Sequence, residues 1–215
     1  MKTIDVADAV AMIPDGASLM IGGFMAVGTP ERMIDELVRQ GRRNLTVIAN
    51  DTAIPGRGIG KLVSAGLVAK TIASHIGLNP ETQKQMIDGK MEVDLVPQGT
   101  LIERIRAGGY GLGGVLTPTG VGTVVEEGKQ RIEVDGKTYL LEKALRADFA
   151  LVHAFLADYI GNLAYALTAR NFNPVIAMAA DKVIATAENI VPVGVISPDQ
   201  VVTPAPLVDY LVAHE

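Results

Sequence analysis

The chain has 215 residues, of which 48% are hydrophobic and only 4% aromatic, and its formal net charge is −5. An acidic chain in which no run of Lys and Arg exceeds two residues argues against a nucleic-acid-binding or anionic-membrane surface. The absence of cysteine excludes disulfides, Cys-ligated zinc and a cysteine nucleophile. Neither a signal peptide nor an apolar stretch of about 18 residues is present, so we expect one cytoplasmic domain over residues 1–215.

Short apolar runs alternate with helical patterns through the first half of the chain. Four of these runs predict buried strands: Ser18–Ile21, Leu45–Ala49, Val68–Ser74 and Val93–Val96. Strands separated by helices predict an α/β fold with an open, mostly parallel sheet flanked by helices. Ligands bind at the carboxyl ends of the strands in such sheets, so the loops after these four strands are the first candidates for a site.

Three helices are predicted between and after these strands. The first begins with Thr29 as its N-cap and Pro30 at its first position, and it ends at Gly41. The other two are expected over Pro80–Asp88 and Leu101–Ala107, each followed by a glycine.

The second half of the chain is less regular. Gly108–Gly128 is rich in glycine and has no helical period. The Asp135-Gly136 pair between Gln130–Val134 and Lys137–Leu141 predicts a small β-hairpin excursion near residues 128–142. A buried strand at Phe149–Ala154 resumes the α/β pattern, which residues 175–185 continue. The last segment carries four prolines and is expected to wrap the surface or a partner.

The most informative segment is Asp15–Pro30, which combines a turn, a buried strand, a glycine loop and a helix start. Gly22 and Gly23 let the backbone approach a ligand without an intervening Cβ. Free N–H groups in the loop and at the helix start form a concavity that suits an anion. Taken alone, the glycines are explained equally well by a tight strand-to-helix turn.

The same segment resembles the first signature of family I CoA-transferases, with an Asp-Gly turn, apolar residues, Gly-Gly-Phe, three residues, then Gly and Pro. Five further blocks resemble the alpha subunit of acetoacetate (acetate/butyrate) CoA-transferases: Ile48–Ala53, Ala73–Gly77, Pro97–Glu103, Thr117–Thr123 and Arg170–Pro174. The resemblance covers nearly the whole chain and implies a CoA-transferase-like fold.

The resemblance also implies roles for particular residues. The loop that contacts CoA and stabilises the oxyanion comprises Gly22, Gly23, Phe24, Met25, Ala26, Val27 and Gly28. Gln98 points its amide at the reacting carbonyl, and Asn50 helps to orient the substrate. From the residues alone, Gln98 is equally read as a cap or turn residue before a helix, and Asn50 as part of a turn. CoA and acyl-CoA are substrates, and no metal or permanently bound cofactor is implied.

The family's nucleophilic glutamate lies in a Ser-Glu-Asn-Gly motif on the other subunit. The nearest match here, Ala187–Ile190, lacks the serine and the glycine, and we expect Glu188 to lie in a solvated turn. Glu126 and Glu127 are expected at an exposed strand end. The resemblance therefore implies a homologous beta subunit that carries the catalytic Glu, with two such pairs forming a heterotetramer. The expected reaction moves CoA between acetyl-, butyryl- or acetoacetyl-CoA and the free acids.

Other motifs carry less weight. Gly109–Gly114 satisfies G-x-G-x-x-G, but a helix precedes it and Val115–Pro118 cannot begin one, so we expect a flap or packed loop near the substrate rather than a dinucleotide site. We expect a hydrogen-bonded structural role for His75 and a satisfied core position for His153, and the third histidine, His214, is too distant in sequence to suggest a metal pair.

Two alternative functions remain open at this point. One is an isomerase or regulator that uses the same framework for sugar phosphates, which favours a lysine or acidic base beside the glycine loop. The other is a noncatalytic subunit that only stabilises another enzyme.

Overall fold

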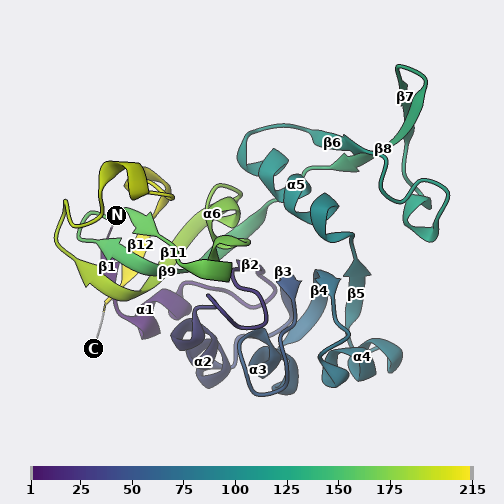
Figure 1. Cartoon of the computed structure of the whole chain (residues 1–215). Coiled ribbons are helices and arrows are strands. Elements are labelled where there is room, and N and C mark those ends of the chain that lie inside the picture. The colour runs from purple at the N-terminus through teal and green to yellow at the C-terminus, as the bar shows by residue number, and fades with distance from the viewer. Residues whose placement is uncertain (1, 214–215) are drawn as a thin grey trace.

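A large, mostly parallel sheet runs through the computed structural model, which describes residues 2–213 (Figure 1). Its strand order is β1-β12-β11-β9-β2-β3-β4-β5. The short strand β10 pairs with β9, and among the described strands of this sheet that pairing is the one antiparallel pairing. The strands are β1 Lys2–Ile4, β2 Ser18–Ile21, β3 Leu45–Asp51, β4 Val68–His75, β5 Glu92–Leu95, β9 Ala147–Asp158, β10 Leu163–Ala164, β11 Ala180–Val191 and β12 Tyr210–Val212. The predicted α/β class with an open, mostly parallel sheet is confirmed.

Helices cover both faces of this sheet (Figure 1). Their bounds are α1 Val6–Ala11, α2 Glu31–Gln40, α3 Ile59–Ser64, α4 Pro80–Ile87, α5 Gln98–Gly109 and α6 Asn173–Ile176. Two apolar cores result, one beneath α1, α2 and α3 and the other beneath α5 and α6. The central strands are apolar on both faces because each face packs against helices, as is usual for parallel sheets.

The chain winds in opposite directions from the middle of the sheet. From β2 it proceeds outward through β3, β4 and β5, and from β9 it proceeds the other way through β11 and β12. Neighbouring β2 and β9 therefore form the topological switch point of the sheet, and ligands of such sheets bind outside the carboxyl ends of the strands at this point. The glycine loop follows β2 directly and lies at the switch point.

A second, three-stranded antiparallel sheet extends away from the main sheet next to α5 (Figure 1). Its order is β6-β8-β7, with β6 Gly114–Thr117, β7 Arg131–Val134 and β8 Lys137–Lys143. The hairpin expected at Asp135-Gly136 is confirmed, with both residues in the left-handed region. The excursion is larger than expected because β6 pairs with the long strand β8.

Three expectations about the second half are wrong. Glu188 lies within β11 rather than in a turn, because β11 pairs with β9 as far as Val191. Glu126 lies in a short 3-10 helix, Val124–Glu126, and pairs with Arg131. The proline-rich end does not only wrap the surface, since β12 enters the sheet between β1 and β11.

Helix ends agree only in part with the predicted caps. Gly41 ends α2 in the left-handed conformation, as expected. Thr29 is not the N-cap, because the helix begins at Glu31 and the Thr29 hydroxyl donates to the Gly22 carbonyl instead. Asn79 caps α4 and also donates to the Thr52 carbonyl, which ties this helix to the loop after β3. No helix within residues 2–213 is long and apolar enough to cross a membrane.

Glu36 in α2 offers a test of stability against pH. Arg39 and Gln40 donate hydrogen bonds to its carboxylate and lower the pKa of Glu36 from 4.5 to about 2. Since the folded pKa is depressed, this contribution is complete above pH 4.5 and is lost as the pH falls towards 2. We expect Glu36→Gln to lower Tm by about 3–6 °C at neutral pH. Thermal unfolding followed by circular dichroism should show this difference shrinking below pH 4.5, and a difference constant with pH would contradict the assignment.

Candidate active site

A cavity of about 260 Å³ lies at the carboxyl ends of β2, β3, β4 and β5. Its lining comes from the loop after β2, the last residues of β3 and β4, the loop after β4 and the first residue of α5, and comprises Phe24, Met25, Asn50, Asp51, Ser74, His75, Leu78 and Gln98. These segments meet because four adjacent parallel strands end at the same edge of the sheet. The structure thus brings Asn50, Gln98 and the glycine loop together, as the sequence suggested.

The glycine loop contains a tight turn of unusual sequence. Phe24 and Val27 exchange two backbone hydrogen bonds, of 3.0 and 2.9 Å, and the residues between them, Met25 and Ala26, have φ values of 50° and 67°. Positive φ at both central positions describes a type I′ turn, which favours Asn-Gly or Asp-Gly. Each non-glycine residue in this region costs roughly 1–2 kcal/mol. Strained backbone of this kind is concentrated at functional sites.

The turn leaves several loop donors available. Among the described residues, the N–H groups of Gly23, Ala26 and Gly28 have no acceptor, whereas those of Phe24 and Val27 are paired with each other. Unpaired backbone donors beside a cavity can stabilise a developing negative charge. Phe24 and Met25 are the loop residues that line the cavity, and the three N–H groups without an acceptor belong to their neighbours in the same loop, which makes them candidate donors for an anion.

Asn173 holds both ends of the glycine loop and is fully buried. Its amide Nδ2 donates to the Gly28 and Ala169 carbonyls, and its Oδ1 accepts from the His153 N–H, each at 2.9 Å. A Cβ at position 22 would lie 1.8 Å from Asn173 Oδ1, and one at position 28 would lie 2.4 Å from the Ala169 Cβ. Glycine at positions 22 and 28 is therefore required by protein packing, and not by a ligand alone.

Asp51 fastens the tip of the loop to the end of β3. Its Oδ2 accepts from the Met25 N–H at 3.0 Å and from Asn50 Nδ2 at 2.8 Å, and its Oδ1 accepts from the Ala53 N–H at 2.7 Å. The side chain is buried, and nothing in the sequence singles it out beyond its place in the Ile48–Ala53 block.

Gln98 is linked to two neighbouring amides. It occupies the first position of α5, which begins three residues earlier than expected, and its Nε2 lies 3.4 Å from the Oδ1 atoms of Asn50 and Asn171. Asn171 Nδ2 is buried and has no partner among the described residues. Asn171 was not predicted as a site residue, although the Arg170–Pro174 block contains it.

The two described histidines differ from each other. His75 is exposed at the rim of the cavity and its ring packs over Gly77, so the hydrogen-bonded structural role expected for it is not found. His153 is satisfied, as expected, because its Nδ1 lies 2.8 Å from the Thr186 hydroxyl. Burial lowers the pKa of His153, and the carboxylates of Glu188 and Glu31 only partly oppose this effect. His214 lies outside the described residues.

The G-x-G-x-x-G segment is packed, but not beside the cavity. Gly108 and Gly109 contact Leu145 and Met178 at the end of α5 opposite to Gln98. This segment therefore lies away from the candidate cavity, because α5 runs back along the sheet and carries the glycines away from its carboxyl edge.

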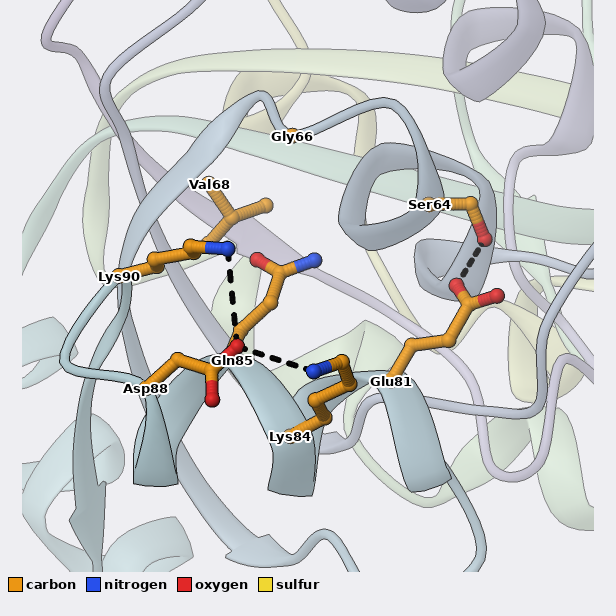
Figure 2. A pocket seen from close by; sticks show the side chains of 8 residues that line it. All are labelled: Ser64, Gly66, Val68, Glu81, Lys84, Gln85, Asp88 and Lys90. Carbon is orange, nitrogen blue, oxygen red and sulfur yellow. Dashed lines mark hydrogen bonds and ion pairs between the residues drawn. The ribbon is translucent and has the colours of Figure 1, made fainter.

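A roomier hollow of about 380 Å³ lies between α3 and α4, near the start of β4 (Figure 2). Its polar groups satisfy one another, because Lys84 and Lys90 both pair with Asp88 and the Ser64 hydroxyl donates to Glu81. The hollow lies at the amino edge of the strands, whereas ligands of such sheets bind at the carboxyl edge. We therefore assign the candidate site to the smaller cavity.

The cavity contains no carboxylate that is free to react. Asp51 is the one acid among its lining residues, and both of its oxygens accept hydrogen bonds from three N–H groups. Glu188 lies on β11 with its Oε1 3.9 Å from His153 Nε2 and does not line the cavity. Within residues 2–213, no cluster of three or more His, Asp or Glu side chains could hold a metal ion.

Comparison with known proteins identifies the family to which this chain belongs. Residues 3–214 match the family model of Coenzyme A transferases. The chain is 55% identical over 214 residues to the Acetate CoA-transferase subunit alpha of Escherichia coli K12, covering 100% of this chain and 97% of that protein. It is 50% identical over 211 residues to the Acetoacetyl-CoA:acetate/butyrate CoA transferase alpha subunit of Clostridium acetobutylicum, covering 98% and 97%.

A solved structure agrees with these relatives. The acyl-CoA transferase of Escherichia coli O157:H7, in a thioester complex with CoA, superposes with a TM-score of 0.87 at 26% identity. The match covers 99% of this chain but only 47% of that one, so this chain spans about half of that protein. By sequence and by fold, the chain belongs to the Coenzyme A transferase family.

Proposed function

We propose that this chain is the alpha subunit of a two-subunit CoA-transferase that moves CoA between acetyl-, butyryl- or acetoacetyl-CoA and free short-chain or 3-oxo acids. The named substrates of the two bacterial relatives support this choice of acids. The observation that carries the proposal is a cavity that Phe24 and Met25 of the glycine loop line together with the Asn50 and Gln98 amides, and that has no free carboxylate. Such a cavity suits stabilisation of an oxyanion and lacks the nucleophile.

The missing nucleophile would be a glutamate of a homologous beta subunit. Its carboxylate attacks the acyl-CoA carbonyl, and the carbonyl oxygen becomes an oxyanion. The CoA thiolate then departs, and the acyl group and the glutamate form a mixed anhydride. The thiolate then attacks the glutamyl carbonyl, which releases the free acid and forms a glutamyl-CoA thioester. The incoming acid reverses both steps, so that water never receives the acyl group. Each donor to the oxyanion contributes about 3–4 kcal/mol in sites of this kind.

In this proposal the glycine loop, Gln98 and Asn50 have different roles. The N–H groups of Gly23, Ala26 and Gly28 and the Gln98 amide stabilise the oxyanion, and Asn50 orients the substrate. Residues 22–28 as a whole contact CoA. CoA enters and leaves as a substrate, without a permanently bound cofactor. Two alpha–beta pairs form a heterotetramer in the cytoplasm, and residues 1–215 act as one domain.

The half-length match to the acyl-CoA transferase supports a partner of similar size, since that longer chain contains room for a second such unit. The isomerase alternative is less well supported. It requires an acidic or lysine base beside the glycine loop, and the acid that lies there, Asp51, is fully engaged with N–H donors.

The test is to purify this chain alone and together with the product of a neighbouring gene for a homologous subunit, and to assay CoA exchange. We expect exchange only in the mixture. After incubation with acyl-CoA, borohydride reduction and mass spectrometry should find the modified glutamate on the partner chain. Exchange by the isolated chain, or a modified glutamate on this chain, would overturn the proposal.

A further inference from the structure

We propose that Asp51 is a positioning residue for CoA transfer. Its buried carboxylate fixes the position of the glycine loop relative to the Asn50 amide. The inference rests on the function proposed above and assigns a role to a residue that does not itself touch the reacting atoms. It starts from the position of Asp51, at the end of β3 and in contact with the loop that follows β2.

The carboxylate of Asp51 is 6% exposed and accepts from three donors on three different residues. A carboxylate suits this position because it is the one common side chain that is acceptor-only on both of its oxygens. An asparagine here would place an NH₂ group against at least one of the three N–H donors. The three hydrogen bonds measure 2.7–3.0 Å, which is within the usual range for an N–H donor and an oxygen acceptor.

Two of these donors belong to strained backbone. Met25 has φ of 50° and Ala53 has φ of 52°, so both are non-glycine residues in the left-handed region. Oδ2 holds the first of them and Oδ1 holds the second. A single carboxylate therefore stabilises the unfavourable conformations of two loops that flank the cavity. Without it, we expect the turn at Met25 and Ala26 to relax, and the free N–H groups of Gly23, Ala26 and Gly28 to lose their alignment.

The third donor extends this influence to the side-chain amides. Asn50 uses its Nδ2 to donate to Asp51 at 2.8 Å, which leaves its Oδ1 facing Gln98 Nε2 at 3.4 Å. If the Asn50 amide turned over, its NH₂ group would face the NH₂ group of Gln98. Asp51 thus sets the direction of the Asn50 amide, and through it the direction of the Gln98 amide.

The chain offers a matched control in Asp158. This aspartate is also buried, at 1% exposed, and also accepts three hydrogen bonds, from the N–H groups of Ile160 and Asn162 and from Asn162 Nδ2. It closes the turn after β9 and makes no hydrogen bond to the glycine loop, Asn50 or Gln98. A loss of stability without a loss of positioning is the expected effect of Asp158→Asn.

The experiment compares Asp51→Ala, Asp51→Asn and Asp158→Asn in the complex with the partner subunit, using acetoacetyl-CoA and acetate. We expect both Asp51 variants to lower kcat by about 10- to 100-fold, with KM for acetoacetyl-CoA changed by less than about threefold. Asp158→Asn should leave kcat within about twofold of wild type. In the Asn50→Ala background the further effect of Asp51→Ala on kcat should be smaller than in wild type, since Asp51 acts partly through Asn50, and it should not vanish because the contact with Met25 remains.

A second measurement does not depend on activity. Hydrogen–deuterium exchange of peptides covering residues 22–28 should accelerate in the Asp51 variants and remain unchanged in Asp158→Asn. If wild-type complex exchanges CoA and the Asp51 variants match Asp158→Asn in kcat, the positioning role is wrong although the proposed function stands. If wild-type complex is inactive, the proposed function fails, and unchanged exchange of residues 22–28 would then reject the structural part of this inference as well.

Discussion

Gly23→Ala is expected to abolish measurable CoA transfer by the reconstituted complex. Gly23 has φ of 115°, a region open to glycine and to few other residues, and a Cβ there would lie 2.2 Å from Thr29 Oγ1 and 3.0 Å from the Thr29 nitrogen. The Thr29 hydroxyl would have to leave the Gly22 carbonyl, to which it donates at 3.0 Å. The loop between these residues would then shift, and with it the free N–H groups of Gly23, Ala26 and Gly28.

The expected loss is at least about 10²–10³-fold in kcat, which corresponds to the removal of one oxyanion donor, and more if several donors move together. Stability should fall by about 1–3 kcal/mol from the backbone strain alone. Gly113→Ala is the matched control, because nothing lies within 4 Å of a Cβ at that position and its φ is not in the left-handed region. Activity assays with thermal unfolding check both variants, and a Gly23→Ala complex that retains a tenth or more of wild-type kcat would refute the role of the loop.

Gln98→Ala is expected to lower kcat by about 10²–10³-fold without a measurable change in Tm. Gln98 is exposed, and its two amide contacts, at 3.4 Å, are long, so its removal takes only weak hydrogen bonds from the Oδ1 atoms of Asn50 and Asn171. A side chain placed at the first position of α5 and held weakly by two neighbouring amides is suited to donate to a substrate oxygen rather than to stabilise the helix.

Gln85→Ala is the matched control for this prediction. Gln85 lies in α4 near the amino edge of the sheet, where its Nε2 donates to the Val63 carbonyl at 2.8 Å (Figure 2). We expect this change to cost some stability and no activity. Steady-state kinetics of both complexes decide the matter: equal kcat values for the two variants would show that Gln98 is no more than a helix-terminal residue.

The sequence predicted the features of this fold that local patterns determine. Alternating apolar runs and helices identified the parallel half of the sheet, and Asp135-Gly136 identified the hairpin, because two-residue turns have strong local preferences. The edge of the sheet where four loops meet followed from the strand order, since the four predicted strands lie side by side. The family resemblance supplied the roles of Gln98 and Asn50, which spacing alone left open.

Features that depend on distant pairing could not be predicted in the same way. β1 and β12 lie next to each other although more than 200 residues separate them, and their short segments have no period of their own. Glu188 belongs to a strand because β9 continues beside it, which its own neighbours in the sequence do not indicate. Asp51 and Asn173 likewise gain importance only from the loop that each contacts in space.

The left-handed turn at Phe24–Val27 was also beyond local inference. Met-Ala is a poor sequence for a type I′ turn, so propensity argues against the conformation that is found. The turn persists because contacts from β3 and from the segment after β9 hold it from outside. Sites at which local preference and tertiary structure disagree are where functional constraints are usually found.

The saturated carboxylate of Asp51 has a consequence for the unassembled polypeptide. With every oxygen of this acid occupied, an unpaired copy of the chain has no free carboxylate in its cavity to open a thioester. If the proposed function holds, alpha subunits without a partner subunit would not consume acyl-CoA in the cell. Turnover would then scale with the scarcer of the two gene products, so that balanced synthesis of both, rather than an inhibitor, sets the capacity of the enzyme.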